Sequence, residues 1–533
     1  MTGFGAPPDG LHQRSNVITV PLGTFKRSDF RCPAADALKA RGYRVRRPAY
    51  GTKEELEHFA LGPFMAALDH EVPDRAEGEG PRRRPTAVHD GLRQWTVHAV
   101  AMYRDAFAPD PDRPLVEQPS PWVYRHQPAS PDHRGAREYR ISVWGRCLRS
   151  EDGTQRELRL PVNRLSSTDP DPGHVAAAAL VLAEGGPGPL PDRLRIVEFA
   201  LFDGSVRVLF EGTRPQALAL YRTHGAKALS ALLDTQDYRP GSGCAECPFQ
   251  SVCPALRKAP GLLGISGTGR PRRSWSVTNG RNYRACPARD HFRRLRLPTA
   301  DAVERSSAAE RGRAVHAYLA QQHGSGPLRT CTDDVPEDWV PDTYALGPQE
   351  RTLGRLLLQR HAVVCPMRFA GDRTDVRAEA RVVRHDTAAD VVVIAAPDLL
   401  YRDGGSWVWR ETKTSASNYR AADDLLVRHP QLALGVLLLA RGDLGGTRAR
   451  ARVELEVLRP DGADLEIIDP FVPAVRSSAE QIVASLVTDW YRDDAFRAAP
   501  GTECSRCEVA RWCPANAAGA GAPTQRAAQE VLA

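Results

Sequence analysis

Long apolar runs are absent from this 533-residue sequence. The longest, at 174–183 and 432–440, have about ten residues, whereas a membrane-spanning helix needs roughly 20. The first residues, MTGFGAPPDGLHQRSN, contain no basic stretch followed by an apolar core, so no signal peptide is expected. We therefore expect a cytoplasmic protein without a transmembrane helix.

The sequence also lacks the motifs of a nucleotide-driven motor and of base-reading domains. No G-x-x-x-x-G-K-[ST] loop is present, which excludes a P-loop helicase motor within the chain. No zinc-finger or homeodomain pattern is present either, so base-specific readout of DNA is not expected. Lysine is scarce, which makes a lysine within a motif more informative than usual. The full set is Lys26, Lys39, Lys53, Lys227, Lys258 and Lys413.

Cysteine, by contrast, is well represented, with 11 residues. A cytosolic chain is not expected to hold stable disulfides, so clustered cysteines indicate metal or cluster ligation. Two triplets share the spacing C-x2-C-x5-C-P-A, and each has a lone upstream cysteine that is also followed by Pro-Ala. The two sets are Cys32 with Cys244, Cys247 and Cys253, and Cys286 with Cys504, Cys507 and Cys513. The remaining Cys147, Cys331 and Cys365 fit neither set and are interpreted as structural.

The spacing of the two sets indicates an internal duplication. In each set the lone cysteine precedes its triplet by roughly 210–220 residues, which implies a repeat of about 255 residues. The boundary falls near 259–275, a stretch rich in Gly, Pro and Arg. We predict a first domain at 1–258, a second at 275–515, and a low-complexity, disordered tail at 516–533.

Four thiolates per domain suit a [4Fe–4S] cluster. Three would come from one tight loop and the fourth from the opposite end of the domain, so that the cluster ties the ends together. Two alternatives stay open: a structural zinc ion held by the same four cysteines, and free thiols.

A second group of residues suggests phosphodiester chemistry. The apolar, β-branched run VVVIAA, starting at 391, predicts a buried strand that leads to Asp398. A turn at 402–405 and a second strand, SWVWRETKTS, follow. Glu411 and Lys413 share one face of that strand, and a hairpin can bring Asp398 beside them. Two carboxylates could then bind Mg²⁺, and Lys413 could orient the attacking water or stabilise the transition state. The alternative is a surface hairpin with an ordinary Glu–Lys pair.

Several motifs of the second half occur in the same order as in a known nuclease family. The second half, over about 275–515, resembles the RecB-type nucleases of the PD-(D/E)xK superfamily, and among them the iron–sulfur members: the CRISPR-associated exonucleases and the AddB nuclease domain. The motifs in order are SVTNGRNYRACPARDHF with Cys286, RGRAVHAYL with His316, APDLL with Asp398, ETKTS with Glu411 and Lys413, HPQLALGVLLL with Gln431, and CSRCEVARWCP with Cys504, Cys507 and Cys513.

The resemblance implies site roles. His316, Asp398 and Glu411 would bind Mg²⁺ or Mn²⁺, and Gln431 would position substrate or Lys413. Glu379 occupies a position where related nucleases often have a glutamate, and its role is left open. The family commonly has a tyrosine four residues after the glutamine; here that position is Gly435, which puts the contact near the phosphate in doubt.

The implied fold is α/β, with two tandem restriction-endonuclease-like domains, each a mixed central sheet flanked by helices. Strands are expected near 391–397, 407–413 and 450–458, and helices near 308–322, 345–362, 423–440 and 476–494. The first half has the cysteines, and His58 could stand where His316 stands, but it has no Asp followed by Glu-x-Lys. Cys147 falls near the Asp position. We interpret this half as a degenerate nuclease domain; the alternative is an unrelated domain whose cysteine spacing coincides.

The expected function is a metal-dependent DNA nuclease, an exonuclease on single-stranded ends, in repair, recombination or defence. Its partners would be DNA and a helicase or ATPase in trans. The alternative is a non-catalytic iron–sulfur protein that binds DNA or acts as a scaffold.

Overall fold

The computed structural model describes residues 7–26, 30–46, 52, 54–69, 87–109, 114–118, 121–267, 269–324, 330–368, 372–416 and 424–516. The chain separates into two compact units. Unit 1 comprises Met1–Leu256, His291–Pro298 and Val509–Ala533, and unit 2 comprises Arg257–Asp290 and Thr299–Glu508. From residue 517 onward, the tail expected from the sequence lies outside the described residues. None of the described helices has the length and apolar character needed to span a bilayer.

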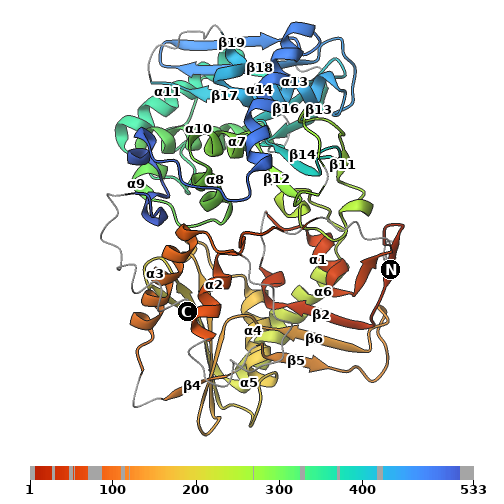
Figure 1. Ribbon diagram of the computed structural model, residues 1–533, viewed down its shortest axis with the longest axis vertical. Helices are drawn as coiled ribbons and strands as arrows, with labels where there is room; N and C mark the ends of the chain where they lie inside the picture. The colour runs from red at the N-terminus through yellow and green to blue at the C-terminus, as the bar shows by residue number, and fades with distance from the viewer. Residues whose placement is uncertain are drawn as a thin grey trace. The chain divides into compact units, whose positions relative to one another are not determined.

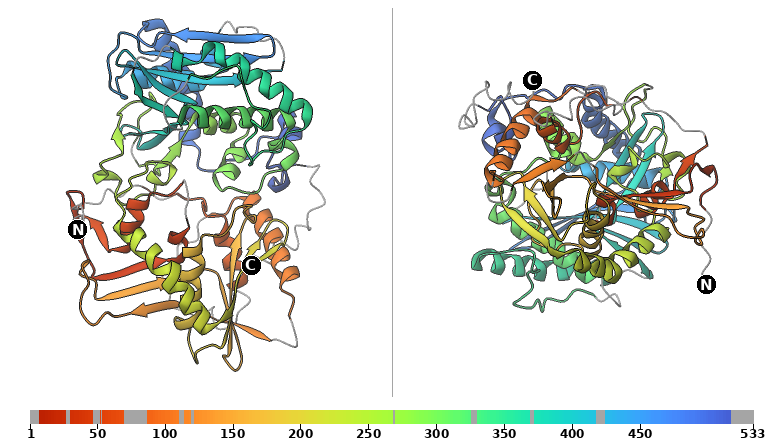
Figure 2. Two further views of the ribbon diagram at one scale, coloured as in Figure 1. Left: turned by 180° about the vertical axis from the view of Figure 1, so that it is seen from behind. Right: turned by 90° about the horizontal axis from the view of Figure 1, so that it is seen from below.

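In the described residues, unit 1 contains a five-stranded sheet, a three-stranded sheet and the helices that connect their strands. Its helices and strands are β1 (Leu11–Gln13), β2 (Val17–Pro21), α1 (Pro33–Ala40), β3 (Tyr43–Val45), α2 (Leu61–Asp69), α3 (Asp90–Ala106), β4 (Leu115–Gln118), β5 (Val123–His126), β6 (Glu138–Ser142), β7 (Arg146–Ser150), β8 (Gln155–Val162), α4 (Pro172–Glu184), β9 (Arg193–Ala200), β10 (Val206–Thr213), α5 (Arg214–Leu220) and α6 (Ala226–Asp234). The sheet β2-β6-β5 is labelled in Figure 1, and its red and orange strands are seen from behind in Figure 2.

Unit 2 also combines a smaller and a larger sheet with flanking helices (Figure 1). Its helices and strands are β11 (Arg257–Lys258), β12 (Arg273–Trp275), α7 (Val277–Ala285), α8 (Pro287–Arg294, which ends in unit 1), α9 (Asp301–Glu304), α10 (Ser307–Gly324), α11 (Pro348–Val364), β13 (Asp372–Ala378), β14 (Val382–Asp386), β15 (Val391–Ala395), β16 (Leu399–Asp403), β17 (Ser406–Thr414), α12 (Leu425–Arg428), α13 (Pro430–Ala440), β18 (Arg452–Arg459), β19 (Gly462–Ile468) and α14 (Pro473–Arg492). The strands and helices expected from the sequence in this half are confirmed, with ends that shift by a few residues and one helix divided into α12 and α13.

The larger sheets of the two units have the same strand order and the same strand directions. In unit 1 the order is β4-β7-β8-β9-β10, and in unit 2 it is β13-β16-β17-β18-β19. In each sheet the two central strands, β8 with β9 and β17 with β18, are parallel, and every other neighbouring pair is antiparallel. The mixed α/β class expected from the sequence is thus confirmed.

One apolar helix connects the two parallel strands in each unit. Helix α4 follows β8 and α13 follows β17, and each begins with a proline at the first helical turn, where no backbone donor is lost. Almost every residue of both helices is buried, because parallel strands need a crossover that covers the sheet. Strand β17 is accordingly buried from Ser406 to Thr412.

The strand that pairs with β17 in the hairpin of unit 2 is not the one expected from the sequence. The sequence suggested that the run starting at 391 pairs with the strand carrying Glu411. In the structure β15 belongs to the smaller sheet β11-β14-β15-β12, and β16 forms the hairpin with β17. No strand is predicted from the sequence between Asp398 and the turn at 402–405, whereas Leu399–Asp403 forms a strand of its own.

Candidate active site

Two carboxylates and a lysine meet at the hairpin of unit 2. Asp398 directly precedes β16, and Glu411 and Lys413 lie on β17 with one residue between them, so alternation places both on one face. The antiparallel pair of Leu399 with Arg410 brings Asp398 to the position opposite Glu411. The structure therefore brings together the Asp-Glu-Lys set identified in the sequence.

The lysine ammonium lies between the two carboxylates. Lys413 Nζ is 3.3 Å from Glu411 Oε2 and 3.7 Å from Asp398 Oδ2. The backbone N–H of Thr412 donates to Asp398 Oδ2 at 2.6 Å, and the indole N–H of Trp409 donates to Glu411 Oε1 at 3.2 Å. Strand β17 thus positions both carboxylates by hydrogen bonds of its own.

His316 and Glu379 flank Asp398 on its other side. His316 projects from α10, and its Nδ1 is 3.1 Å from Asp398 Oδ1. One ligand atom each from His316, Glu379 and Asp398 lies within 4.8 Å of the others. Glu379, left open in the sequence, thus belongs to the site. Its φ of 48° is uncommon for a residue with a side chain, and such strained backbone is typical of functional sites. Its backbone N–H donates to the carbonyl of Asp398 at 3.0 Å.

Burial and crowded negative charge shape the protonation of this site. Burial, and then the charge of Asp398, raise the pKa of Glu411 to about 7. Burial and Asp398 also raise the pKa of Glu379. Burial opposes ionisation of Asp398 as well, but the hydrogen bond and charge of His316 outweigh it and lower its pKa. The site therefore holds more negative charge than Lys413 and His316 readily balance.

A divalent cation fits this set of donors. Carboxylate oxygens are the ligands that Mg²⁺ and Mn²⁺ prefer. Glu379, Asp398 and Glu411 supply them, and His316 adds an imidazole nitrogen. A bound cation would also offset the charge that raises the pKa values of the two glutamates.

Gln431 lies in the first turn of α13 and is partly exposed. Among the described residues, no hydrogen bond joins it to the other candidate site residues.

The space beside Gly435, where the family commonly has a tyrosine, is occupied by the indole ring of Trp409. A Cβ at this position would lie 3.0 Å from the indole of Trp409. Trp409, whose N–H contacts Glu411, was missed in the sequence, although its position two residues before Glu411 places it on the same face of β17.

The corresponding positions of unit 1 carry no ionisable side chains. When the hairpin β7–β8 is aligned with β16–β17 at their first residue pairs, Gly145, Leu160 and Val162 match Asp398, Glu411 and Lys413. Gly145 has a φ of 152°, and a Cβ there would lie 2.6 Å from the carbonyl oxygen of Arg159. An aspartate could not replace it without a backbone shift.

Cys147 and His58 of unit 1 lie at positions that differ from those expected from the sequence. Cys147 was expected near the Asp position; it lies two residues further along, within β7, and is buried. His58 was expected to stand where His316 stands, on a helix. It precedes α2 in a segment without regular structure and is 3.8 Å from Glu246 through Nε2. It is therefore not positioned as His316 is.

The first cysteine set is gathered in unit 1. The backbone N–H of Arg239 donates to Cys32 Sγ, and that of Gly241 donates to Cys244 Sγ, both at 3.4 Å. Burial, together with the nearby thiols of Cys247, Cys253 and Cys32, raises the pKa of Cys244 to about 11. The pKa of Cys247 is raised by burial and by two of the same neighbours. All four thiols are therefore close in space, and without a positive partner Cys244 stays protonated.

The same backbone contacts recur in unit 2. The N–H of Ala499 donates to Cys286 Sγ, and that of Gly501 donates to Cys504 Sγ, again both at 3.4 Å. Cys507 follows in unit 2, whereas Cys513 belongs to the segment Val509–Ala533 of unit 1. N–H donors aimed at sulfur favour thiolates over thiols, as thiolate ligands of iron–sulfur clusters require. The backbone N–H donors to Cys32, Cys244, Cys286 and Cys504 thus suit thiolate ligands.

Comparison with known proteins is consistent with this geometry. Residues 274–514 match the family model described as PD-(D/E)XK nuclease superfamily. This part of the chain is therefore a PD-(D/E)XK nuclease superfamily domain, a class of phosphodiester hydrolases. The match covers a little under half of the chain.

Two solved structures resemble the chain loosely. SSO0001 is 15% identical, with a TM-score of 0.24, over 48% of this chain and 90% of that one. An exonuclease candidate from Eubacterium rectale is 13% identical, with a TM-score of 0.30, over 45% of this chain and 87% of that one. No curated protein gives a significant match.

Proposed function

We propose that unit 2 is a Mg²⁺- or Mn²⁺-dependent DNA nuclease that acts as an exonuclease on single-stranded ends. The observation that carries this proposal is the position of Lys413 Nζ, 3.3 Å from Glu411 and 3.7 Å from Asp398. Two carboxylates that share one ammonium in a nuclease-superfamily domain suit the hydrolysis of a phosphodiester.

His316, Asp398 and Glu411 would hold the cation, and Glu379 lies where it could join them. The cation would supply a Lewis acid that offsets phosphoryl charge and lowers the pKa of a water. Lys413 would orient the attacking water and stabilise charge on the phosphate oxygens. Trp409 would keep Glu411 turned toward the cation through its N–H bond.

Positive charge beside the site supports a nucleic-acid substrate. Burial lowers the pKa of His429 to about 4, and the nearby charges of Lys413, Arg428 and Arg281 act in the same direction. His429 precedes α13, which also carries Gln431. Three cationic groups therefore lie near the start of this helix, where they could contact the phosphate backbone. Gln431 would help to position the substrate there.

We further propose that both cysteine sets hold [4Fe–4S] clusters and that the two units arose by duplication. The shared strand order and the paired N–H donors to Cys32, Cys244, Cys286 and Cys504 support a common origin. Unit 1 would then be a degenerate nuclease domain that holds DNA or docks a partner. Repair, recombination or defence would be the setting, with a helicase or ATPase in trans.

Cleavage of end-labelled DNA tests the nuclease proposal. The anaerobically purified chain is incubated with single- and double-stranded DNA and Mn²⁺, beside Asp398→Asn. Degradation by the wild type, with loss of at least 100-fold in the variant, is expected, and the label left at either end gives the polarity. An inert wild type with intact cluster absorbance would instead favour the non-catalytic DNA-binding or scaffold function.

A further inference from the structure

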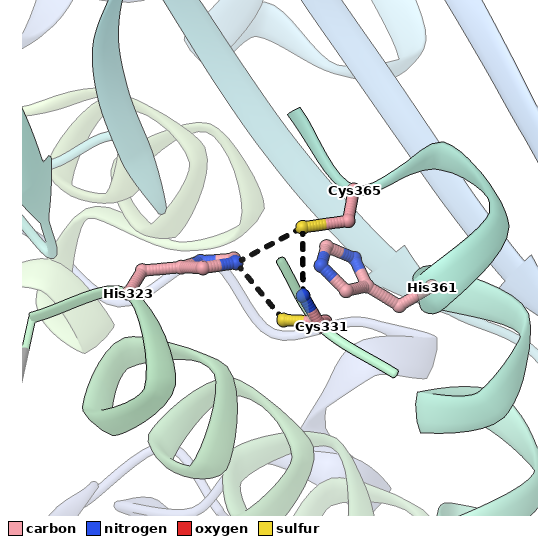
Figure 3. A group of neighbouring side chains, drawn as sticks. All are labelled: His323, Cys331, His361 and Cys365. Atoms are coloured by element: carbon pink, nitrogen blue, oxygen red, sulfur yellow. Dashed lines mark hydrogen bonds between the residues drawn. The ribbon is translucent and has the colours of Figure 1, made fainter. Parts of the chain in front are cut away.

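A second group of metal-ligand side chains lies in unit 2, and it uses none of the residues assigned above. It consists of His323, Cys331, His361 and Cys365 (Figure 3). His323 is near the end of α10, Cys331 lies in the segment before α11, His361 is in the last turn of α11, and Cys365 caps that helix. Figure 3 shows the two sulfurs and the two imidazole rings turned toward one another.

The distances in this group match a tetrahedral zinc site. Every pair of candidate ligand atoms lies within 4.8 Å. His323 Nε2 is 3.4 Å from Cys331 Sγ and 3.8 Å from Cys365 Sγ. Zinc binds sulfur at about 2.3 Å and nitrogen at about 2.0–2.1 Å, so a tetrahedron around it separates its ligands by about 3.3–3.8 Å. The two sulfur–nitrogen separations thus fall at the spacing that the ion requires, and the other pairs lie within 4.8 Å.

The imidazole of His361 is oriented as a metal ligand would be. Its Nδ1 is 2.6 Å from Glu456 Oε1, and both side chains are buried. Its Nε2 is also buried, has no partner at hydrogen-bond geometry among the described residues, and lies near the thiol of Cys365. Histidines that bind metals usually donate their other ring nitrogen to a carboxylate in this way, which directs the free nitrogen at the ion. Burial of a polar atom without a partner is otherwise unfavourable.

We propose that His323, Cys331, His361 and Cys365 bind a structural Zn²⁺ ion. Two thiolates and two imidazoles fill four coordination positions, which leaves none for water and is typical of structural zinc. Soft sulfur ligands distinguish this site from the carboxylate-rich catalytic site, and it is independent of the proposed nuclease function.

The proposed zinc site is linked to the catalytic residues by α10 and by β17. His316 and His323 are seven residues apart on α10, about two helical turns, and so share one face. Glu456, the partner of His361, also accepts a hydrogen bond from Thr412 Oγ1 at 3.0 Å, and the N–H of Thr412 binds Asp398. An ion that joins α10 to α11 would therefore hold the helix that positions His316.

X-ray absorption at the zinc edge tests the proposal directly. The full chain, with its iron content intact, is dialysed against EDTA and measured. The expected result is about one zinc per chain, bound by two sulfurs and two nitrogens. Cys365→Ser and His361→Gln should each lose most of this zinc. Asp398→Asn, which removes a catalytic carboxylate, and Cys147→Ala, which removes a buried cysteine elsewhere, should keep it.

Three results would overturn the proposal. The first is a wild-type chain that neither retains zinc nor rebinds it. The second is zinc bound by four sulfurs, which would assign the ion to one of the cysteine sets. The third is a Cys331–Cys365 disulfide in protein purified anaerobically, detected by mass spectrometry. The zinc content and ligands of the wild-type chain test the proposal even if a variant fails to fold. An absence of DNA cleavage would count against the proposed nuclease function and not against the zinc site.

Discussion

The five-stranded sheets of the two units have the same order and directions but differ at the three positions to which we assign the catalytic side chains. Unit 2 has Asp398, Glu411 and Lys413, whereas the aligned positions of unit 1 are Gly145, Leu160 and Val162. The backbone arrangement therefore does not depend on the catalytic side chains. Sheets with one strand order can therefore carry different side chains at the same register positions.

Two buried glutamates, one in each unit, have pKa values shifted in opposite directions. Glu198 of unit 1 lies on β9 opposite Leu160, the counterpart of Glu411. The two glutamates are equally buried, at 5% and 4% exposed. Burial opposes the ionisation of Glu198, but Lys26 at 2.7 Å and Arg207 at 2.5 Å outweigh it and lower its pKa. Glu411 has a raised pKa instead. In unit 1 the charge of Glu198 is balanced by Lys26 and Arg207. In unit 2 the negative charge around Glu411 is not fully balanced, and a cation would bind there.

The largest effect is expected at the lysine. Lys413→Met should lower the DNA cleavage rate by about 10³-fold or more, because it removes the charge that stabilises the transition state. Measured in single-turnover assays, Val162→Lys in this background should restore nothing, since unit 1 has no carboxylates at the aligned positions. Rescue by Val162→Lys would mean that unit 1 retains a working site.

Opposite pH dependences of stability are expected for the two glutamates. The raised pKa of Glu411 means that its ionisation destabilises the fold as pH rises from about 4.5 to about 7. Without added divalent cation, Glu411→Gln should therefore stabilise the chain at pH 8 by about 1–3 kcal/mol. The lowered pKa of Glu198 stabilises the fold above its unfolded-state value, so Glu198→Gln should destabilise it at pH 8.

Thermal unfolding at pH 5 and pH 8 measures both effects. The gain from Glu411→Gln should shrink at pH 5, where Glu411 is protonated in the folded state. Destabilisation by both substitutions at pH 8 would contradict the contrast between the two units.

A smaller effect is expected from the indole that contacts Glu411. Trp409→Phe removes the N–H donor, and the loss of about 0.5–1.5 kcal/mol should weaken Mn²⁺ binding by about 2–10-fold. Trp407→Phe is the matched control, because its buried N–H has no hydrogen-bond partner among the described residues. If both substitutions weaken Mn²⁺ equally, the effect comes from packing of β17 and not from the bond to Glu411.

The sequence predicted most of unit 2 because its signals are local. A β-branched run marks β15, and a Glu-x-Lys pair on a strand defines one face without further information. The structure added what depends on tertiary contact: β16 as the true partner of β17, Glu379 beside Asp398, and the meeting of His323, Cys331, His361 and Cys365 from separate elements. No spacing rule identifies a site whose ligands come from two helices and a loop.

In unit 1 the sequence shows which catalytic residues are absent, but not which residues occupy their positions. The absence of a Glu-x-Lys pair was visible, but the aligned position of Asp398 could be found only from strand register, which identifies Gly145. A Pro-Gly pair precedes both cysteine triplets, as Pro240-Gly241 and Pro500-Gly501. It was a usable signal, because the glycine N–H of each pair binds the first cysteine of its triplet.

Equilibrium binding of Mn²⁺ to the full chain at pH 8, with Glu411→Gln and Glu198→Gln as matched variants, shows which unit holds the catalytic metal. We expect Glu411→Gln to weaken binding by at least 10-fold and Glu198→Gln to leave it within twofold of the wild type. Equal binding by the wild type and Glu411→Gln would contradict the assignment of the catalytic metal to unit 2. Selective loss in Glu198→Gln would place the site in unit 1 instead.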